Sequence, residues 1–384
     1  MFGMQGDAIG TIIWFLLFFV FIFIYPRMML SQMIMKLEQS AQRMEQLSVK
    51  AKNMIVKKVG KKSKIIDAKV RNFQDFIAIE PTSLDPYGIV RKIDHITRSV
   101  ETRFQQFVDE IAGEKNKREK QEINFGLRAA IGVHTIAKIV RHYVEIVKKF
   151  KNLQLAIILQ MQLPEIERIA KSELKGTEAF VGGYPIGDSI GPMVAASLID
   201  KSREITDDVV CGETKILGRK AFVLKAKGPG PHLGRIDEAL EKILKKNRIA
   251  RVITVDAAGK LEGEKTGSVA EGVGFAMAYT AERQLIEDIL IPRKIPIDAI
   301  AVKVGLEEAI TPMKMEIKNS IPEVIDAIKT STKRTKKHDK IIVIGVGNSC
   351  GIGDDKKSLE QAEKTISKLD KKLKKEKEKK RRWF

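Results

Sequence analysis

Two aspartates stand where a carboxylate could do chemistry. Asp188 lies in the glycine-rich segment GGYPIGDSIGP (182–192), and Asp256 follows the apolar run 251–255. Aspartate is disfavoured inside strands, and α/β sheets bind ligands beyond the carboxyl ends of their strands, so Asp256 should face such a crevice. Two facing carboxylates can act as general acid and base on a bound water, or can hold a cation that activates it. For Asp188, capping of the following helix is the alternative role.

Two further loops follow predicted strands and are rich in glycine. In AKGPGPHLGR (226–235), backbone N–H groups could hold an anion beside His232 and Arg235, although the two prolines favour a rigid turn. The loop IGVGNSCGIGDD (344–355) is followed by no further strand, so it lacks the context of a dinucleotide fold. Its Cys350 would need a nearby base to act as a nucleophile, and the sequence identifies none.

These loops lie in a part of the chain where short β-branched runs alternate with amphipathic patterns. The runs predict strands at 179–181, 220–225, 251–255, 299–304 and 340–344, and the patterns predict helices at 192–201, 235–246, 269–287 and 321–330. Strands that alternate with helices are typical of a mostly parallel sheet covered on both faces. We therefore predict a three-layer α/β domain over residues 177–355.

The start of the chain predicts a membrane anchor. No charged residue interrupts the run 8–25, which at about 1.5 Å per residue nearly crosses a hydrocarbon core of roughly 30 Å. A cleaved signal peptide is disfavoured, because the leader lacks basic residues and the run ends in bulky side chains. Basic residues follow the run, so we expect a single-pass protein with its N-terminus outside and its bulk in the cytoplasm. We assign residues 1–30 to this anchor.

Helices are predicted between the anchor and the α/β domain. Apolar or small residues recur at spacings of four and three over 30–55, which indicates a coiled-coil-like stripe. Such a helix either pairs with a second copy of the chain or packs back on the protein. Residues 31–64 should hold this helix and a basic linker, and residues 65–176 a helical domain that the turn EPTSLDPYG (80–88) interrupts.

Composition limits the class of protein further. The chain has 384 residues, enough for two domains with a sizeable core, and its 2 cysteines fit a reducing compartment. Its net charge of +20 is concentrated after the anchor and in the basic tail 356–384. That tail could bind anionic lipid headgroups or RNA, or it could remain a solvated, disordered segment.

Taken in order, the loops resemble those of a known fold. The segments GDSIGP (187–192), VITVDAAG (252–259) and AVKVGLEEAITPMKMEIKNSIPEVIDAI (301–328) resemble parts of the hydrogenase-maturation endopeptidases and of the spore germination protease. The resemblance implies a peptidase-like site with Asp188 and Asp256 as its paired carboxylates, which in the maturation enzymes engage a metal. A histidine completes that metal site. Here no histidine lies between Asp256 and His338, and Glu271 is the residue that could replace it.

The whole layout of anchor, helical region, EPTSLDPYG segment and α/β domain also resembles an archaeal family of membrane proteins with no assigned function. Two functions therefore stay open. The first is a membrane-tethered hydrolase in which Asp188 and Asp256, with Glu271, hold a divalent metal ion. The second is a non-catalytic scaffold or binding module. Its partners would be the bilayer, a protein or second copy at helix 30–55, and RNA or anionic lipid at the tail.

Overall fold

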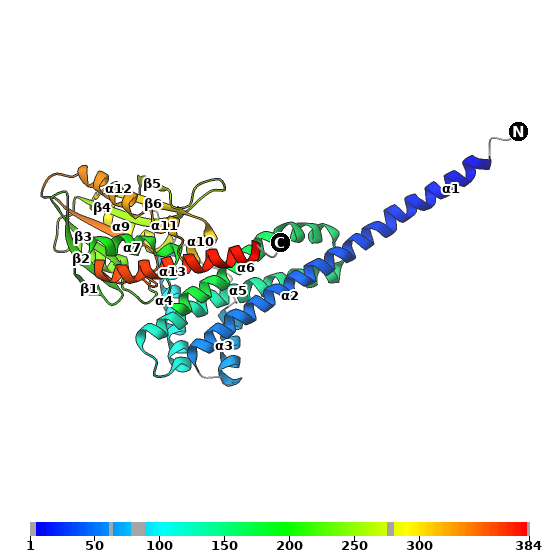
Figure 1. Cartoon of the computed structure of the whole chain (residues 1–384), viewed down its shortest axis with the longest axis horizontal. Helices are drawn as coiled ribbons and strands as arrows, with labels where there is room; N and C mark the ends of the chain where they lie inside the picture. The colour runs from blue at the N-terminus through cyan, green and yellow to red at the C-terminus, as the bar shows by residue number, and fades with distance from the viewer. Residues whose placement is uncertain (1–4, 61–63, 78–88, 275–279, 382–384) are drawn as a thin grey trace.

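The structure is a computed structural model that describes residues 5–60, 64–77, 89–274 and 280–381. Along the chain it consists of a long N-terminal helix, a bundle of helices and an α/β domain (Figure 1). The EPTSLDPYG segment, predicted as a turn, lies outside the described residues.

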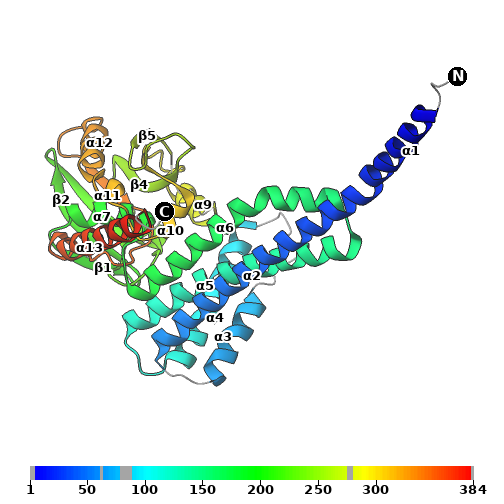
Figure 2. The ribbon, with the colours of Figure 1, turned by 45° about the vertical axis from the view of Figure 1, so that its right-hand side comes forward.

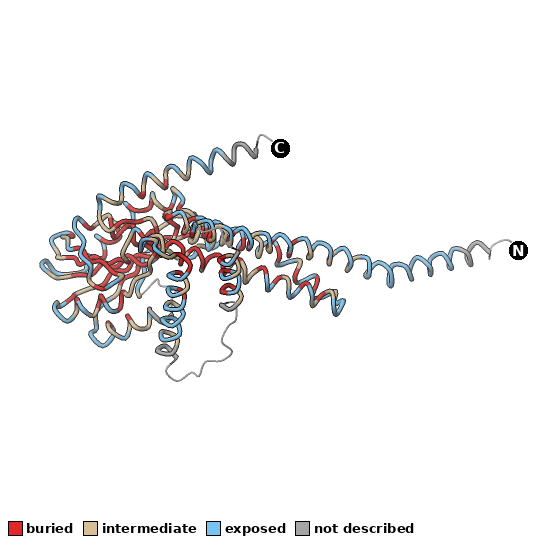
Figure 3. The backbone as a smooth tube through the Cα atoms, turned by 90° about the horizontal axis from the view of Figure 1, so that it is seen from below, coloured by how far each residue is buried: buried red, intermediate tan, exposed pale blue. Residues whose placement is uncertain are grey.

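The N-terminal helix is a continuous rod whose first part stands away from the protein. It consists of α1 (Gln5–Phe19), the π-helical turn η1 (Val20–Ile24) and α2 (Tyr25–Val59). Figure 3 shows that the rod is exposed until α2 reaches the other helices. Large apolar side chains are exposed along this first part, among them Trp14 at 70% and Phe21 at 65%.

The helical region packs around the second half of this rod. It contains α3 (Lys64–Ile77), α4 (Ile89–Ala112), α5 (Lys117–Phe150) and α6 (Leu153–Gly182), and α2, α5 and α6 lie side by side (Figure 2). The predicted apolar stripe of α2 is buried against α5 and α6 and includes Leu37, Ala41 and Met44. Of the two alternatives for this stripe, the structure therefore shows the one in which the helix packs back on the protein.

The α/β domain is built on a sheet of 7 strands in the order β1-β2-β3-β7-β4-β6-β5. The strands are β1 (Ser202–Thr206), β2 (Val209–Ile216), β3 (Arg219–Ala226), β4 (Arg251–Gly259), β5 (Val269–Val273), β6 (Ile297–Val304) and β7 (Lys340–Gly345). β3, β7, β4 and β6 pair in parallel, whereas β1, β2 and β5 add antiparallel pairings at the two edges. The sheet is therefore mixed, and its parallel part is confined to the four central strands.

Helices cover both faces of this sheet. Apolar side chains of α7 (Ile190–Leu198), α12 (Ile321–Lys333) and α13 (Lys356–Arg381) pack on one face, where they meet Ile253 and Val255 of β4. Those of α8 (Ile236–Leu244) and α9 (Thr280–Leu290) pack on the other face, against Val252 of β4. The short helices η2 (Gly187–Ser189), α10 (Leu306–Ile310) and α11 (Met315–Lys318) lie in the connecting segments.

Two predicted elements were wrong. The strand predicted at 179–181 is the last turn of α6, which ends at Gly183 in the left-handed conformation. The helix predicted at 269–287 begins as the edge strand β5, and its described helical part, α9, starts at Thr280. The basic tail is helical as far as Arg381, and the first half of α13 is anchored in the core by Ala362 and Ile366.

Candidate functional site

Asp188 lies on one of the loops that meet at the carboxyl ends of the parallel strands, and Asp256 lies on β4 close to them. The loop after β7 is bonded to both of its neighbours through the backbone. Val346 N–H donates to Val255 O of β4 at 2.8 Å, and Gly351 N–H donates to Pro229 O, in the loop after β3, at 2.9 Å. This edge of the domain is therefore one connected set of loops.

The start of α7 is pressed onto the strand ends. A Cβ atom added to Gly191 would lie 2.0 Å from Val346 O and 2.5 Å from Val255 O. Both contacts are with backbone atoms, which cannot move aside as a flexible side chain can. Glycine at this position therefore lets the loop that holds Asp188 approach β4 and β7.

Gly191→Ala is expected to lower the free energy of unfolding by about 2–4 kcal/mol, because one added methyl group must displace two strand ends. The measurement is thermal or urea unfolding followed by circular dichroism. Gly272→Ala is the matched control, because Gly272 is also in the α/β domain and a Cβ there meets no atom within 4 Å. Equal unfolding midpoints for the two variants would contradict the close approach of α7.

Asp188 is tied to the loop after β7. Its Oδ2 accepts a hydrogen bond from Asn348 N–H at 2.8 Å, which joins two segments 160 residues apart. Burial raises the pKa of the Asp188 carboxyl, and the bond from Asn348 opposes that shift. The hydrogen bond from Asn348 thus directs the Asp188 carboxylate toward the ends of the strands. The N-cap position of α7 is held by Ser189, whose side chain makes no capping hydrogen bond.

Asp256 lies at the same edge, on β4. Its side chain is buried, and its Oδ1 accepts the N–H of Ala257 at 2.7 Å. Strand alternation places it on the face opposite Val255, whereas Asp188 precedes α7, which covers the Val255 face. The structure therefore brings both aspartates to the place where β7 ends beside β4, which they reach from opposite faces of the sheet.

Glu271 is not brought to this place. Its neighbour Ala270 is in register with Ala301 of β6, which is in register with Asp256, so Glu271 projects from the other face of the sheet. The Glu271 carboxylate lies 3.8 Å from Arg334 instead. Within the described ranges, no three side chains of His, Cys, Asp or Glu are grouped so that they could hold a metal ion. The residues present therefore do not fit the metal site that the resemblance implies.

The sequence analysis missed a buried ion pair at this edge. The Lys225 side chain is 0% exposed, and its Nζ donates to Asp354 Oδ1 at 2.6 Å and to Ala226 O at 2.7 Å. The same Oδ1 accepts Gly228 N–H at 2.8 Å. Burial lowers the pKa of the Lys225 ammonium, and Asp354 opposes that shift. The available signal was a lysine inside the apolar run of β3, a position that requires a buried acidic partner.

Cys350 has no surroundings that would make it a nucleophile. Its side chain is fully buried, and burial raises the pKa of its thiol far above the usual range.

His134, in the helical region, has structural contacts on both ring nitrogens, because its ring bonds Ser48 Oγ at 2.9 Å and Asp75 Oδ1 at 2.8 Å.

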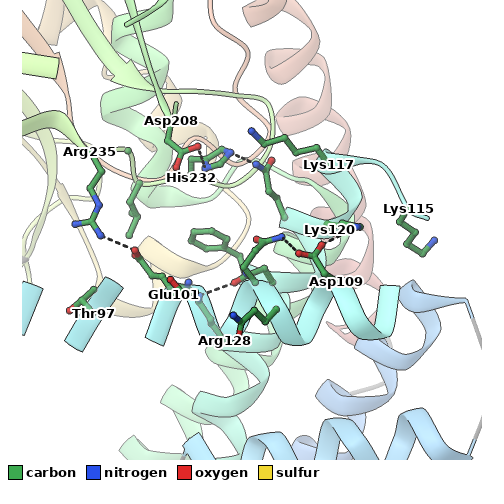
Figure 4. Close-up of a pocket in the computed structure, with 18 of the residues that line it drawn as sticks. Thr97, Glu101, Asp109, Lys115, Lys117, Lys120, Arg128, Asp208, His232 and Arg235 are labelled. Carbon is green, nitrogen blue, oxygen red and sulfur yellow. Dashed lines mark hydrogen bonds and ion pairs between the residues drawn. The ribbon is translucent and has the colours of Figure 1, made fainter. Parts of the chain in front are cut away.

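His232 and Arg235 face the helical region. Figure 4 shows them at one wall of a cavity of about 950 Å³, between the loop after β3 and helices α4 and α5. Arg235 pairs with Glu101 of α4 at 2.8 Å, and Gln121 of α5 hydrogen-bonds to Nε2 of His232. The α/β domain is thus fastened to the helical region on both sides of this cavity.

The fold defines a class of protein in which an apolar helix and a helical bundle precede an α/β domain with a mixed sheet. Two family models match the chain: the N-terminal domain of a protein of unknown function (DUF1512) over residues 11–183, and the C-terminal domain of the same description over residues 186–353. The chain therefore belongs to the DUF1512 family. No curated protein and no solved structure matches it.

Proposed function

We propose that the protein is anchored in a membrane by its first helix and holds the α/β domain on one side as a ligand-binding module. The observation that carries this proposal is that the apolar segment of the rod is exposed on all its faces. Burial of each large apolar side chain in lipid would contribute about 1.5–3 kcal/mol, which the protein itself does not supply here.

A second helix is long and apolar enough to cross a membrane, but its packing gives it another role. The two candidates are Gly10–Val59 and Lys117–Phe150; the apolar window of the first is 0% buried and that of the second is 50% buried. The second is α5, whose apolar side chains form the core with α2 and α6. This contrast favours one membrane span.

The charge at the end of the helical bundle next to the apolar segment indicates on which side of the membrane the bundle would lie. Lys148 of α5 pairs with Glu38 of α2, so the turn between α5 and α6 lies beside the part of α2 that follows the apolar segment. Basic residues therefore gather there, namely Arg27, Lys36, Lys148, Lys149 and Lys151. The basic end of α13 also points toward the side on which α1 projects (Figures 1 and 3). By the positive-inside rule and by attraction to anionic lipid, this side is cytoplasmic.

Extraction from membranes tests the anchor. The full-length protein should remain in the pellet after alkaline carbonate treatment, whereas Leu16→Arg with Phe19→Arg should release it, because each central arginine costs about 2.5–3.5 kcal/mol. The matched control is Ile158→Arg with Met161→Arg, since these side chains of α6 are also apolar and exposed, at 53% and 73%. Release of the wild type by carbonate would refute the anchor.

A second candidate function is hydrolysis at the strand edge, favoured by the arrival of Asp188 and Asp256 at the place where β7 ends beside β4. With the described residues forming no metal site, the two carboxylates would act directly as acid and base on a water. Asp188, whose pKa is raised, would be the acid.

Turnover of peptide and ester substrates by the full-length protein tests this candidate. Asp188→Asn and Asp256→Asn should each reduce turnover by at least about 100-fold, as is usual for a general acid or base. Asp207→Asn, at an exposed position in the turn between β1 and β2, is the control. Equal turnover in all variants would refute the site, and no turnover by the wild type would favour the non-catalytic binding module.

A further inference from the structure

The cavity between the two halves of the protein has the size and the walls of a ligand site. Its volume is about 950 Å³, at the upper end of the range for small-molecule pockets, and such pockets occur preferentially between domains. One wall comes from α4, one from the first turns of α5, and one from the loop after β3 (Figure 4). The Arg235–Glu101 and His232–Gln121 contacts hold these walls together.

Positive charge exceeds negative charge around this cavity. Five lysines and arginines line it against three acids, and the eight residues are Lys115, Lys117, Lys120, Arg128, Arg235, Glu101, Asp109 and Asp208. Two of the acids are paired with a lysine or an arginine of the protein, and Asp208 faces the imidazole of His232. Glu101 is 2.8 Å from Arg235, Asp109 is 2.9 Å from Lys120, and Asp208 is 3.5 Å from His232.

These pairs leave Lys115, Lys117 and Arg128 of the five basic residues, and Lys115 pairs with Glu119 at 3.4 Å. Lys117 forms no ion pair among the residues that the structure describes, although its charge lowers the pKa of Glu204, and its ammonium lies near His232 in Figure 4. Burial is the main cause that lowers the pKa of His232, and the positive charges of Lys117 and Lys227 lower it further. The negative charges of Asp208 and Asp354 act in the opposite direction and raise this pKa. Burial therefore disfavours the charged form of this imidazole.

The start of α5 adds a partial positive charge from the backbone, part of which the Glu119 carboxylate already meets through the capping box, where it accepts Asn116 N–H at 3.4 Å. Lys117, Lys120 and Gln121 belong to the first turns of α5, a helix that begins at the capping residue Asn116. The N-terminal end of a helix carries a partial positive charge and favours anions, phosphate groups above all. An ammonium group beside it is a common phosphate ligand.

Each of the three walls also carries an apolar side chain, one from α4, one from α5 and one from the loop after β3. They are Ile93, Phe125 and Leu233, and the Arg128 guanidinium lies 5.0 Å from the centre of the Phe125 ring. A flat or apolar body could lie there while a charged group reaches Lys117. We propose that this cavity binds a small organic phosphate of about nucleotide size, with its phosphate at Lys117 and the start of α5 and its apolar part against Phe125.

Calorimetric titration of the full-length protein in detergent tests this proposal, with adenosine monophosphate, adenosine and inorganic phosphate as separate probes. We expect adenosine monophosphate to bind saturably and more tightly than either fragment. Lys117→Gln should weaken its binding at least about tenfold, as expected for a hydrogen bond to a charged group. Lys149→Gln, at an exposed lysine near the other end of α5, should leave the affinity unchanged.

A steric variant separates the two parts of the site. Thr97 lines the cavity from α4 and is exposed, so Thr97→Trp should fill part of the volume without disturbing a core. It should abolish binding of adenosine monophosphate while binding of inorganic phosphate persists. Absence of saturable binding of adenosine monophosphate to the wild type, or equal losses in the Lys117 and Lys149 variants, would overturn the proposal. Neither outcome depends on the membrane anchor or on turnover at the aspartates.

Discussion

Asp354→Ala is expected to lower the free energy of unfolding of the α/β domain by about 3–5 kcal/mol, the usual cost of breaking a buried ion pair from one side. The change leaves the fully buried Lys225 ammonium without a carboxylate and removes the acceptor of Gly228 N–H. Thermal unfolding of the full-length protein, followed by circular dichroism, measures the loss.

A second variant tests whether the uncompensated charge on Lys225 causes this loss of stability. Lys225→Met keeps an apolar stem of similar length and removes the charge, so adding it to Asp354→Ala should restore much of the lost stability. Asp326→Ala is the surface control. Asp326 is 75% exposed and pairs with Lys329 one helical turn away, a contact that contributes little. Unfolding of Asp354→Ala at the temperature of Asp326→Ala would show that the buried pair is not needed.

Glu173→Gln is expected to stabilise the helical region at alkaline pH. Burial raises the pKa of Glu173 from 4.5 to about 7. The folded protein therefore holds this proton more tightly than the unfolded chain, and stability falls as the pH rises from about 4.5 to 7. Above that window the ionised carboxylate costs about 3 kcal/mol, at about 1.4 kcal/mol per pKa unit, and glutamine removes this cost.

The packing of α6 against α5 explains why this carboxylate is buried. A Cβ atom at Gly132 of α5 would lie 3.2 Å from the Glu173 carboxyl group, so the glycine provides the space that the carboxyl occupies. Unfolding curves of wild type and Glu173→Gln should converge near pH 4.5 and separate above about pH 7. Glu178→Gln, at an exposed position of the same helix, is the control. A constant difference across this range would mean that Glu173 titrates normally.

The central strands could be predicted from sequence because burial on both faces requires continuous apolar runs. β3, β4, β6 and β7 all follow such runs. β2 was missed because VVCGETKI mixes a glycine, an acid and a lysine into the strand, as an antiparallel strand near an edge permits. β5 lies in a segment predicted as a helix, because it has four exposed residues after Val269 and therefore lacks the apolar signal of a strand.

The error at 179–181 has a local cause. Ala, Phe and Val read as a short strand, but they continue an apolar helix face and are followed by Gly182 and Gly183. Gly183 has a φ of 64°, the left-handed conformation in which helices often end. The paired glycines were the available signal for the end of a helix.

The position of Asp256 after the apolar run of β4 could be read from sequence, whereas the strand predicted before Asp188 is the end of α6, and the contacts of the two aspartates could not be read at all. The bond between Asp188 and Asn348 and the pair of Lys225 with Asp354 join segments more than a hundred residues apart. Pairing at that distance depends on strand order, and the order of β3, β7 and β4 differs from their order in the chain. The cavity is further from prediction still, because its walls come from two different domains.

If the apolar segment is embedded as we propose, the continuous rod also determines how the protein can move relative to a bilayer. α2 has 35 residues and is joined to the apolar segment without a break in the helix, so its far end stands roughly 50 Å from the membrane-embedded part. Because α5 and α6 are packed along it, a change in the tilt of the embedded helix must swing the whole body as a lever. A tilt of about 20° would carry that far end some 15–20 Å sideways. With the anchor we propose, the α/β domain would be held at a set height above the lipid, and its orientation would follow the angle of the embedded helix.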